Sequence, residues 1–109
     1  EVAKTLTNLA SANGDLGDAA TAKRQLERAL AIMERHYGKD HAEVAVTLTN
    51  LAIETRMLGG AATAKRQLER ALAINERHYG KDYVEVAKTL TNLASANGDL
   101  GDAATAKRQ

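Results

Sequence analysis

The chain repeats itself with a period of 42 residues. Its opening segment, EVAKTLTNLA, returns with one substitution at Glu43 and unchanged at Glu85. The first two units share 32 of 42 residues, and residues 1–25 match residues 85–109 at all 25 positions. A period this regular is typical of stacked supersecondary units, because a single unit cannot bury its own apolar face. The sequence therefore divides into repeat 1 (1–42), repeat 2 (43–84) and a partial repeat 3 (85–109).

Two amphipathic helices are predicted in each unit, because apolar residues recur at helical spacing. In repeat 1 they are Leu6, Leu9 and Leu16 on the first helix and Ala22, Leu26, Ala29 and Leu30 on the second. Gly17 suits the turn between them, since glycine takes a positive φ without steric cost. Asn13 lies on the apolar side, so it needs a hydrogen-bond partner unless the helix frays there. The predicted helices cover 1–15 and 19–37 in repeat 1, 41–57 and 61–79 in repeat 2, and 83–99 and 103–109 in repeat 3.

Polar residues at the predicted helix ends indicate where the helices begin. Asp18 is expected to cap the second helix of repeat 1 with its carboxylate. Asp40 with Glu43 forms a D-x-x-E pattern, which predicts a capping box at the start of the next helix. Asp82 with Glu85 repeats this pattern and predicts the same start for the first helix of repeat 3.

The composition excludes several classes of protein. With 15 Lys and Arg residues against 14 Asp and Glu, the formal net charge is +1, which argues against nucleic-acid binding through phosphate contacts. The chain has no Cys, which excludes disulfides, thiolate metal ligands and a cysteine nucleophile. No apolar stretch approaches the ~18 residues of a membrane span, and no apolar leader is visible at Glu1. We therefore expect a cytoplasmic protein that binds neither nucleic acid nor membrane.

The spacing of several residues in repeat 1 resembles the tetratricopeptide repeat. These residues are Leu6, Leu9, Ala10, Gly17, Ala22, Leu26 and Ala29. The 42-residue unit is similar to the longer repeats of kinesin light chains and of arrays attached to fungal and bacterial signalling NTPases. The segment GKDHAEVAVTLTNLA (38–52) carries that likeness. The resemblance implies an all-α fold, a right-handed α-solenoid of antiparallel helix pairs.

The same resemblance implies a concave groove, lined by the first helix of each unit, that binds a peptide or a helix. The candidate groove residues are Lys4, Asn8, Ser11, Asp15, Val46, Asn50, Ile53, Met57, Lys88, Asn92, Ser95 and Asp99. Asn8, Asn50 and Asn92 would form a ladder, since an amide both donates to and accepts from a peptide backbone. The plainer interpretation is a row of surface asparagines that bond to water or to a neighbouring helix.

Other candidate residues would set the specificity of the groove. Lys4 and Lys88 would attract an acidic peptide, whereas Asp15 and Asp99 oppose it. A small apolar patch is formed by Val46, Ile53 and Met57. This patch has two interpretations, as packing between repeats or as an adaptable contact surface that contains methionine.

The sequence contains no pattern that predicts catalysis. His36 and His41 bracket Asp40, but their separation is not the i, i+4 spacing of helical zinc ligands. Tyr83 replaces the second histidine in the next unit. The frame of a P-loop and the Gly-x-Ser-x-Gly pattern of a nucleophile elbow are both missing. We expect no enzymatic activity, no metal and no cofactor.

The sequence therefore predicts a non-catalytic scaffold for protein–protein interaction. The alternative is a structural spacer or a self-associating repeat array within a larger signalling protein. Repeat 2 departs from repeat 1 mainly at 53–57, so a further hypothesis is an array that alternates two unit types with an 84-residue period. The last predicted helix reaches only Gln109, and an uncapped end of this kind favours end-to-end stacking of copies.

Overall fold

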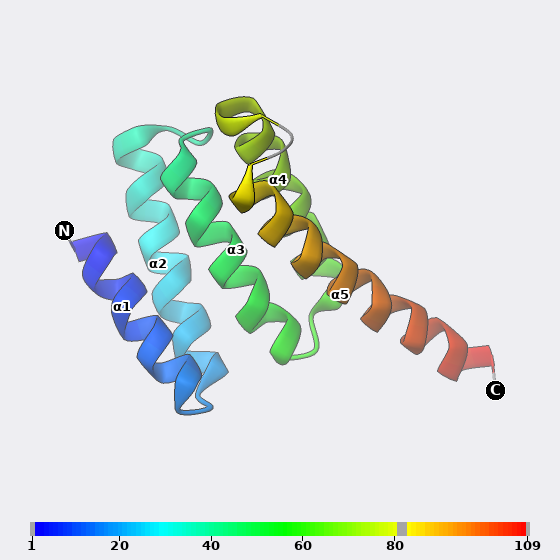
Figure 1. Ribbon diagram of the computed structural model, residues 1–109. Coiled ribbons are helices and arrows are strands. Elements are labelled where there is room, and N and C mark those ends of the chain that lie inside the picture. The colour runs from blue at the N-terminus through cyan, green and yellow to red at the C-terminus, as the bar shows by residue number, and fades with distance from the viewer. Residues whose placement is uncertain (1, 81–82, 109) are drawn as a thin grey trace.

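The computed structural model describes residues 2–80 and 83–108, with residues 2, 79 and 102–108 described by their backbone alone. Within these residues it contains α-helices and no strand. The helices are α1 (Val2–Asp15), α2 (Ala19–Tyr37), α3 (Ala42–Met57), α4 (Ala61–Tyr79) and α5 (Val84–Arg108). Consecutive helices pack in antiparallel pairs, and the C-terminal half of α5 extends beyond the others (Figure 1). The predicted all-α solenoid of helix pairs is therefore confirmed.

Small residues at the helix crossings let the paired helices approach closely. In α2, Ala22 and Ala29 are fully buried and Leu26 is 3% exposed. Alanine removes bulk at the crossing, and leucine fills the space on either side. One apolar cluster joins α1, α2, α3 and α4 and contains Ala3, Leu6, Ala29, Met33, Val44, Ala45, Leu48, Ala71 and Ile74. The core is therefore continuous from repeat 1 to repeat 2.

The turn between α1 and α2 is made by Gly17, with a φ of 85°. Asp18 N donates to the Asn13 carbonyl at 2.8 Å and closes this turn. The Asn13 side chain donates to Gln25 Oε1 at 2.8 Å. The polar residue on the apolar side of α1 therefore has the partner that its position requires.

The predicted cap of α2 is present, and repeat 2 lacks its equivalent. Asp18 Oδ1 accepts from Thr21 N at 3.1 Å, and hydrogen bonds from Thr21 lower the pKa of this carboxyl. In α4 the cap position is Gly60, which offers no side-chain bond. A Cβ at Gly60 would lie 2.9 Å from Thr55 Cγ2 and 3.1 Å from the Thr55 carbonyl oxygen. Thr55 therefore explains why this cap is a glycine, since a side chain does not fit there.

The capping box predicted at Asp40 is wrong, because α3 begins one residue later. The cap is His41, whose Nδ1 accepts from Glu43 N at 3.1 Å. The His41 ring stacks on Tyr37 with 4.4 Å between centroids, and the Asp40 carboxylate lies 3.3 Å from Arg77 of α4. Contacts on both sides of the turn thus favour His41 over Asp40 as the cap. The second predicted box, which begins at Asp82, lies outside the described residues.

The C-terminal part of the chain differs from the prediction of two helices over 83–99 and 103–109. The predicted turn at Gly101 does not form, and α5 continues through it (Figure 1). Gly17 makes the corresponding turn in repeat 1 with a φ of 85°, whereas Gly101 lies within the helix. An uninterrupted helix keeps its backbone hydrogen bonds without the entropic cost of a reversal.

Repeat 2 also contacts repeat 1 through polar side chains of α4. Arg70 donates to Glu34 Oε2 of α2 at 2.6 Å. His78 Nε2 lies 2.6 Å from the carbonyl oxygen of Asp40 in the loop between α2 and α3. The second helices of neighbouring repeats are therefore joined at the surface, above the apolar core.

Candidate functional site

A groove of about 590 Å³ lies between α3 and α5. It is lined by Val46, Thr49, Asn50, Ile53, Tyr83, Glu85, Lys88, Thr91 and Asn92. The α3 wall uses Val46, Asn50 and Ile53, which share one helix face because they are spaced i, i+4 and i+7. Lys88 and Asn92 occupy the equivalent face of α5. These five residues belong to the predicted groove set, and the structure brings them together.

A second, smaller groove of about 280 Å³ lies between α1 and α3. Its lining residues are Ala10, Ser11, Gly14, Asp15, Leu26, Asn50, Ile53, Glu54 and Met57. Asn50 and Ile53 line both grooves, so α3 forms a ridge between them. Met57 is 64% exposed and Ile53 is 38% exposed. The apolar patch of α3 is therefore open to solvent and is only partly used in packing between repeats.

The four other predicted residues lie apart from these two grooves. Lys4 borders a third hollow of about 600 Å³, which the end of α2 and the start of α3 also line. Asn8, Ser95 and Asp99 line none of the three hollows. Eight of the twelve predicted residues therefore line one or both of the two grooves.

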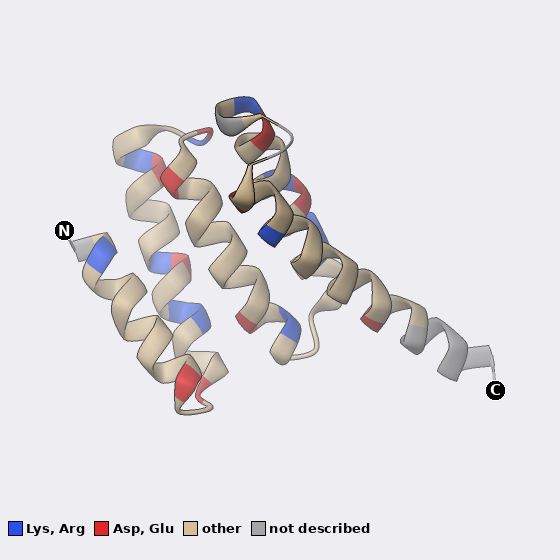
Figure 2. Cartoon of the chain, viewed as in Figure 1, with Lys and Arg blue, Asp and Glu red and all other residues tan. Residues whose placement is uncertain are grey.

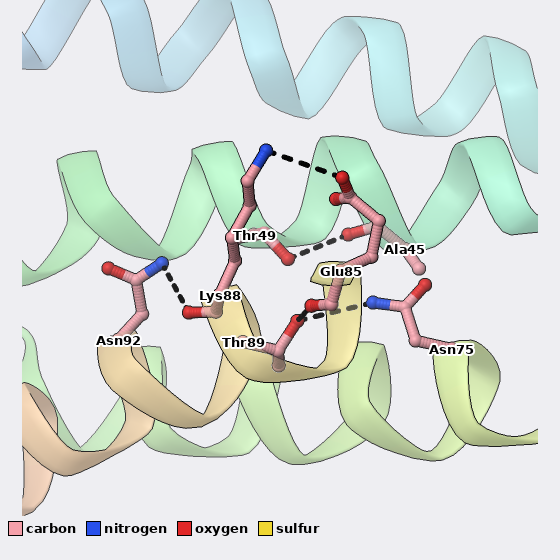
Figure 3. A network of polar contacts seen from close by, with 7 residues as sticks. All are labelled: Ala45, Thr49, Asn75, Glu85, Lys88, Thr89 and Asn92. Carbon is pink, nitrogen blue, oxygen red and sulfur yellow. Dashed lines mark hydrogen bonds and ion pairs between the residues drawn. The ribbon is translucent and has the colours of Figure 1, made fainter. Parts of the chain in front are cut away.

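The three asparagines of the predicted ladder have different environments. Asn50 is half-buried at the ridge between the two grooves. Asn92 Nδ2 donates to the Lys88 carbonyl of its own helix at 3.2 Å (Figure 3). Asn8 is exposed and lies outside the grooves. Of the three asparagines, Asn50 and Asn92 line a groove, and Asn50 lines both.

Two of the predicted charged residues already have partners on the protein. Lys88 Nζ lies 3.3 Å from Glu85 Oε1 (Figure 3). Asp99 accepts from Arg56 Nε at 2.6 Å, and this hydrogen bond to the carboxylate raises the pKa of Arg56. Charges of both signs are interspersed over the helices (Figure 2). The groove therefore has a mixed electrostatic character.

Glu54 is a groove residue that the sequence prediction missed. Within the described residues its Oε2 is buried without a hydrogen-bond partner. Its Oε1 touches α1, since a Cβ on Gly14 would lie 2.6 Å away. Burial, followed by the negative charge of Asp15, raises the pKa of the Glu54 carboxyl. The available signal was the change from Ala12 in repeat 1 to a charged residue in repeat 2.

The prediction also missed the threonines that line the wider groove. Thr49 Oγ1 donates to the Ala45 carbonyl at 2.9 Å (Figure 3). Thr91 Oγ1 donates to the Ala87 carbonyl at 3.0 Å. Their hydroxyl protons are thus used within the helices, while the oxygens can still accept. Each directly precedes an asparagine of the ladder, and that adjacency was the signal in the sequence.

The histidines do not assemble a metal centre in the described part of the chain. His36 and His41 border the same hollow, but His41 Nδ1 is already the acceptor that caps α3. In residues 2–80 and 83–108, no group of three His, Cys, Asp or Glu side chains is placed to hold a metal ion.

Comparison with known families decides the classification. A family model described as tetratricopeptide repeat matches residues 1–77. The chain belongs to the tetratricopeptide repeat family. Tetratricopeptide repeats generally mediate protein–protein interaction or scaffolding, and the family is generally non-catalytic. No curated protein sequence matches the chain. Among the described residues of this tetratricopeptide repeat chain, no helix has the length and apolarity of a membrane span.

Proposed function

We propose that this tetratricopeptide repeat chain binds a peptide or a helix along α3, in the groove between α3 and α5. The observation that supports this proposal is the place of Asn50, which lines both grooves beside Ile53. An amide flanked by exposed apolar side chains suits a ligand that offers both a polar backbone and an apolar anchor. The groove volume of about 590 Å³ fits a short segment rather than a globular partner.

The ligand that best fits the groove is an extended segment with few net charges. Lys88 is paired with Glu85 and Asp99 with Arg56, so neither offers a full charge to a ligand. Val46, which is 38% exposed, adds apolar surface to the α3 wall. We therefore expect selection by apolar side chains, with backbone hydrogen bonds that are independent of sequence.

The test compares Asn50→Ala with Asn8→Ala in the 109-residue chain. Both asparagines stand in the same TLTNLA segment, but only Asn50 lines a groove. With a ligand obtained from a peptide array, Asn50→Ala should weaken binding about 10-fold, the cost of roughly one hydrogen-bond partner. Asn8→Ala should change the affinity by less than about 2-fold. Equal affinities for the three proteins would refute a role for the ladder position.

A second candidate function is a structural spacer within a larger protein. The ion pair between Arg56 and Asp99 favours it, because both charges are used in a contact between repeats 2 and 3. A peptide array that yields no ligand, together with an unchanged fold, would favour the spacer.

We also infer that the unit is of the long kind found in kinesin light chains and in signalling NTPase arrays. The support is the 42-residue period and the segment GKDHAEVAVTLTNLA (38–52). A cytoplasmic location stays a prediction of the sequence.

A further inference from the structure

The helices α1 and α5 share one sequence but bury opposite faces. We define the outer face as Thr5, Leu9 and Ala12 on α1, and as Thr89, Leu93 and Ala96 on α5. On α5 this face is covered, with Thr89 at 1% and Ala96 at 0% exposure. On α1 the same face is open, with Leu9 at 48% exposure. The chain thus carries two copies of one face, one packed on its neighbours and one exposed to solvent.

The surface that covers the outer face of α5 is built by α3 and α4. Asn75 Nδ2 of α4 donates to Thr89 Oγ1 at 3.2 Å (Figure 3). Leu93 and Ala96 pack in a cluster with Ala64 and Leu68 of α4. This surface therefore supplies a hydrogen-bond donor and an apolar contact area that are complementary to the outer face.

The charges of this interface match as well. Arg56 of α3 donates to both carboxylate oxygens of Asp99, at 2.6 and 3.3 Å. Asp15 holds the position of Asp99 on α1 and is exposed. The carboxylate that a docked α1 would present to Arg56 is therefore already in place.

We propose that the outer face of α1 docks on the α3–α4 surface of a second copy of this chain. In a single copy α5 occupies that surface and competes with the incoming α1. Because residues 1–15 and 85–99 are identical, the incoming helix repeats the contacts that Thr89, Leu93, Ala96 and Asp99 make with α3 and α4. This inference does not depend on peptide binding in the groove.

A docked second copy gains a contact that α5 does not provide. Between repeats 1 and 2, Arg70 of α4 donates to Glu34 of α2 at 2.6 Å. The equivalent pair across the new interface is Arg28 on α2 of the second copy and Glu76 on α4 of the first. The segment of α5 after Gly101 continues the helix and does not fold back as α2 does. The incoming repeat therefore adds this ion pair to the contacts that its first helix shares with α5.

The association is head to tail and does not close on itself. One end of each copy presents the outer face of α1, and the other end presents the α3–α4 surface. Two different surfaces in contact produce an open-ended array rather than a closed dimer. Each added copy contributes two units, and its Asn8 takes the place that Asn92 holds in the single copy.

The test uses Ala96→Arg and Ala12→Arg, a matched pair in identical local sequence. Ala96→Arg should undock α5, open the α3–α4 surface, and raise the weight-average mass in sedimentation at least about 2-fold at concentrations where the parent chain is monomeric. Ala12→Arg in addition should return the protein to a monomer with unchanged helicity. A folded Ala96→Arg variant that stays monomeric would overturn the proposal. Association that survives the added Ala12→Arg change would also overturn it.

A second measurement covers the case in which Ala96→Arg does not fold. It follows the methyl signals of Leu9 and Leu90 in the unaltered chain by NMR as its concentration rises. Leu9 is 48% exposed and lies on the outer face. Signals of Leu9 that shift with concentration support docking, and those of Leu90 should shift with them because the incoming α1 displaces α5. Constant Leu9 signals at all concentrations, or Leu9 shifts that persist in the Ala12→Arg variant, contradict it.

Discussion

The same sequence forms α1 and most of α5, and the two helices have different environments. In α1, the inner face packs on α2, and Ala3, Leu6 and Ala10 are at most 8% exposed. The equivalent residues of α5 are open to solvent, with Leu90 at 49% exposure. The outer faces show the reverse. A helix of this array therefore has two faces that can be buried, and its neighbours decide which one is.

The two helices also meet different side chains of α3. The end of α1 faces Glu54, whose carboxylate touches Gly14 and lies near Asp15. The corresponding end of α5 faces Arg56, which pairs with Asp99. Repeat 2 thus presents a negative group to one neighbour and a positive group to the other. The charge that repeat 2 presents therefore differs between its two neighbouring repeats.

The largest effect expected from this comparison comes from Leu6→Ala against Leu90→Ala. Leu6 is 8% exposed in the core, so its truncation should cost about 2–3 kcal/mol of unfolding free energy. Leu90 is half exposed, and its truncation should cost less than about 1 kcal/mol. Denaturant unfolding measures both. Equal losses would mean that the inner face of α5 is covered in solution and that the comparison fails.

The next-largest effect is a change in unfolding free energy that should have opposite signs for Gly17→Ala and Gly101→Ala. Gly17 has a φ of 85°, so an alanine there should cost about 1–2 kcal/mol. Gly101 lies inside α5 with open space around its Cβ position, so an alanine there should stabilise the helix by about 0.5–1 kcal/mol. Thermal unfolding followed by circular dichroism tests this. If Gly101→Ala destabilises the chain as much as Gly17→Ala does, then the turn predicted at Gly101 forms in solution.

A smaller effect is expected from Thr89→Val against Thr5→Val. Thr89 accepts from Asn75, which is 2% exposed, so its loss should leave a buried donor unpaired at a cost of about 1 kcal/mol. Thr5 is exposed on α1, and the same change should stay within about 0.5 kcal/mol. Chemical denaturation under one set of conditions compares the two. A larger loss for Thr5→Val would indicate that the outer face of α1 is the one in use.

The smallest effect concerns pH and Glu54→Gln. The pKa of Glu54 is raised in the folded chain, so its contribution to stability is present below the unfolded pKa and is lost as pH rises through the folded pKa. Glu54→Gln should therefore stabilise the chain at neutral pH by a few tenths of a kcal/mol. The advantage should vanish in acid, where the carboxyl is protonated. Unfolding curves across that pH range measure it, and a pH-independent difference would exclude this cause.

Much of the local structure followed from the sequence. The bounds of α2 and α4 are those of the predicted helices, because the apolar stripes and Gly turns are local signals. The cap of α3 was placed wrongly at Asp40 because the stacking of His41 on Tyr37 is a contact across the turn. The continuation of α5 through Gly101 was missed because the same Leu-Gly pair makes a turn after α1 and stays helical in α5.

The groove was predictable in part. Helical spacing placed Val46, Asn50 and Ile53 on one face, and the structure keeps them together. Spacing did not reveal that Asn92 bonds to its own helix or that Asp99 pairs with Arg56. These contacts depend on side-chain conformation and on the distance between helices, neither of which a single helix encodes.

The sequence by itself determined that the chain is a helical repeat array with a 42-residue unit, because periodicity and turn glycines act within a few residues. Tertiary structure alone decided which face of each repeated helix is buried and whether a Gly becomes a turn. Residues 1–15 and 85–99 are identical, yet they bury opposite faces. The reason is physical: burial is a property of a pair of surfaces, and the second surface belongs to a neighbour.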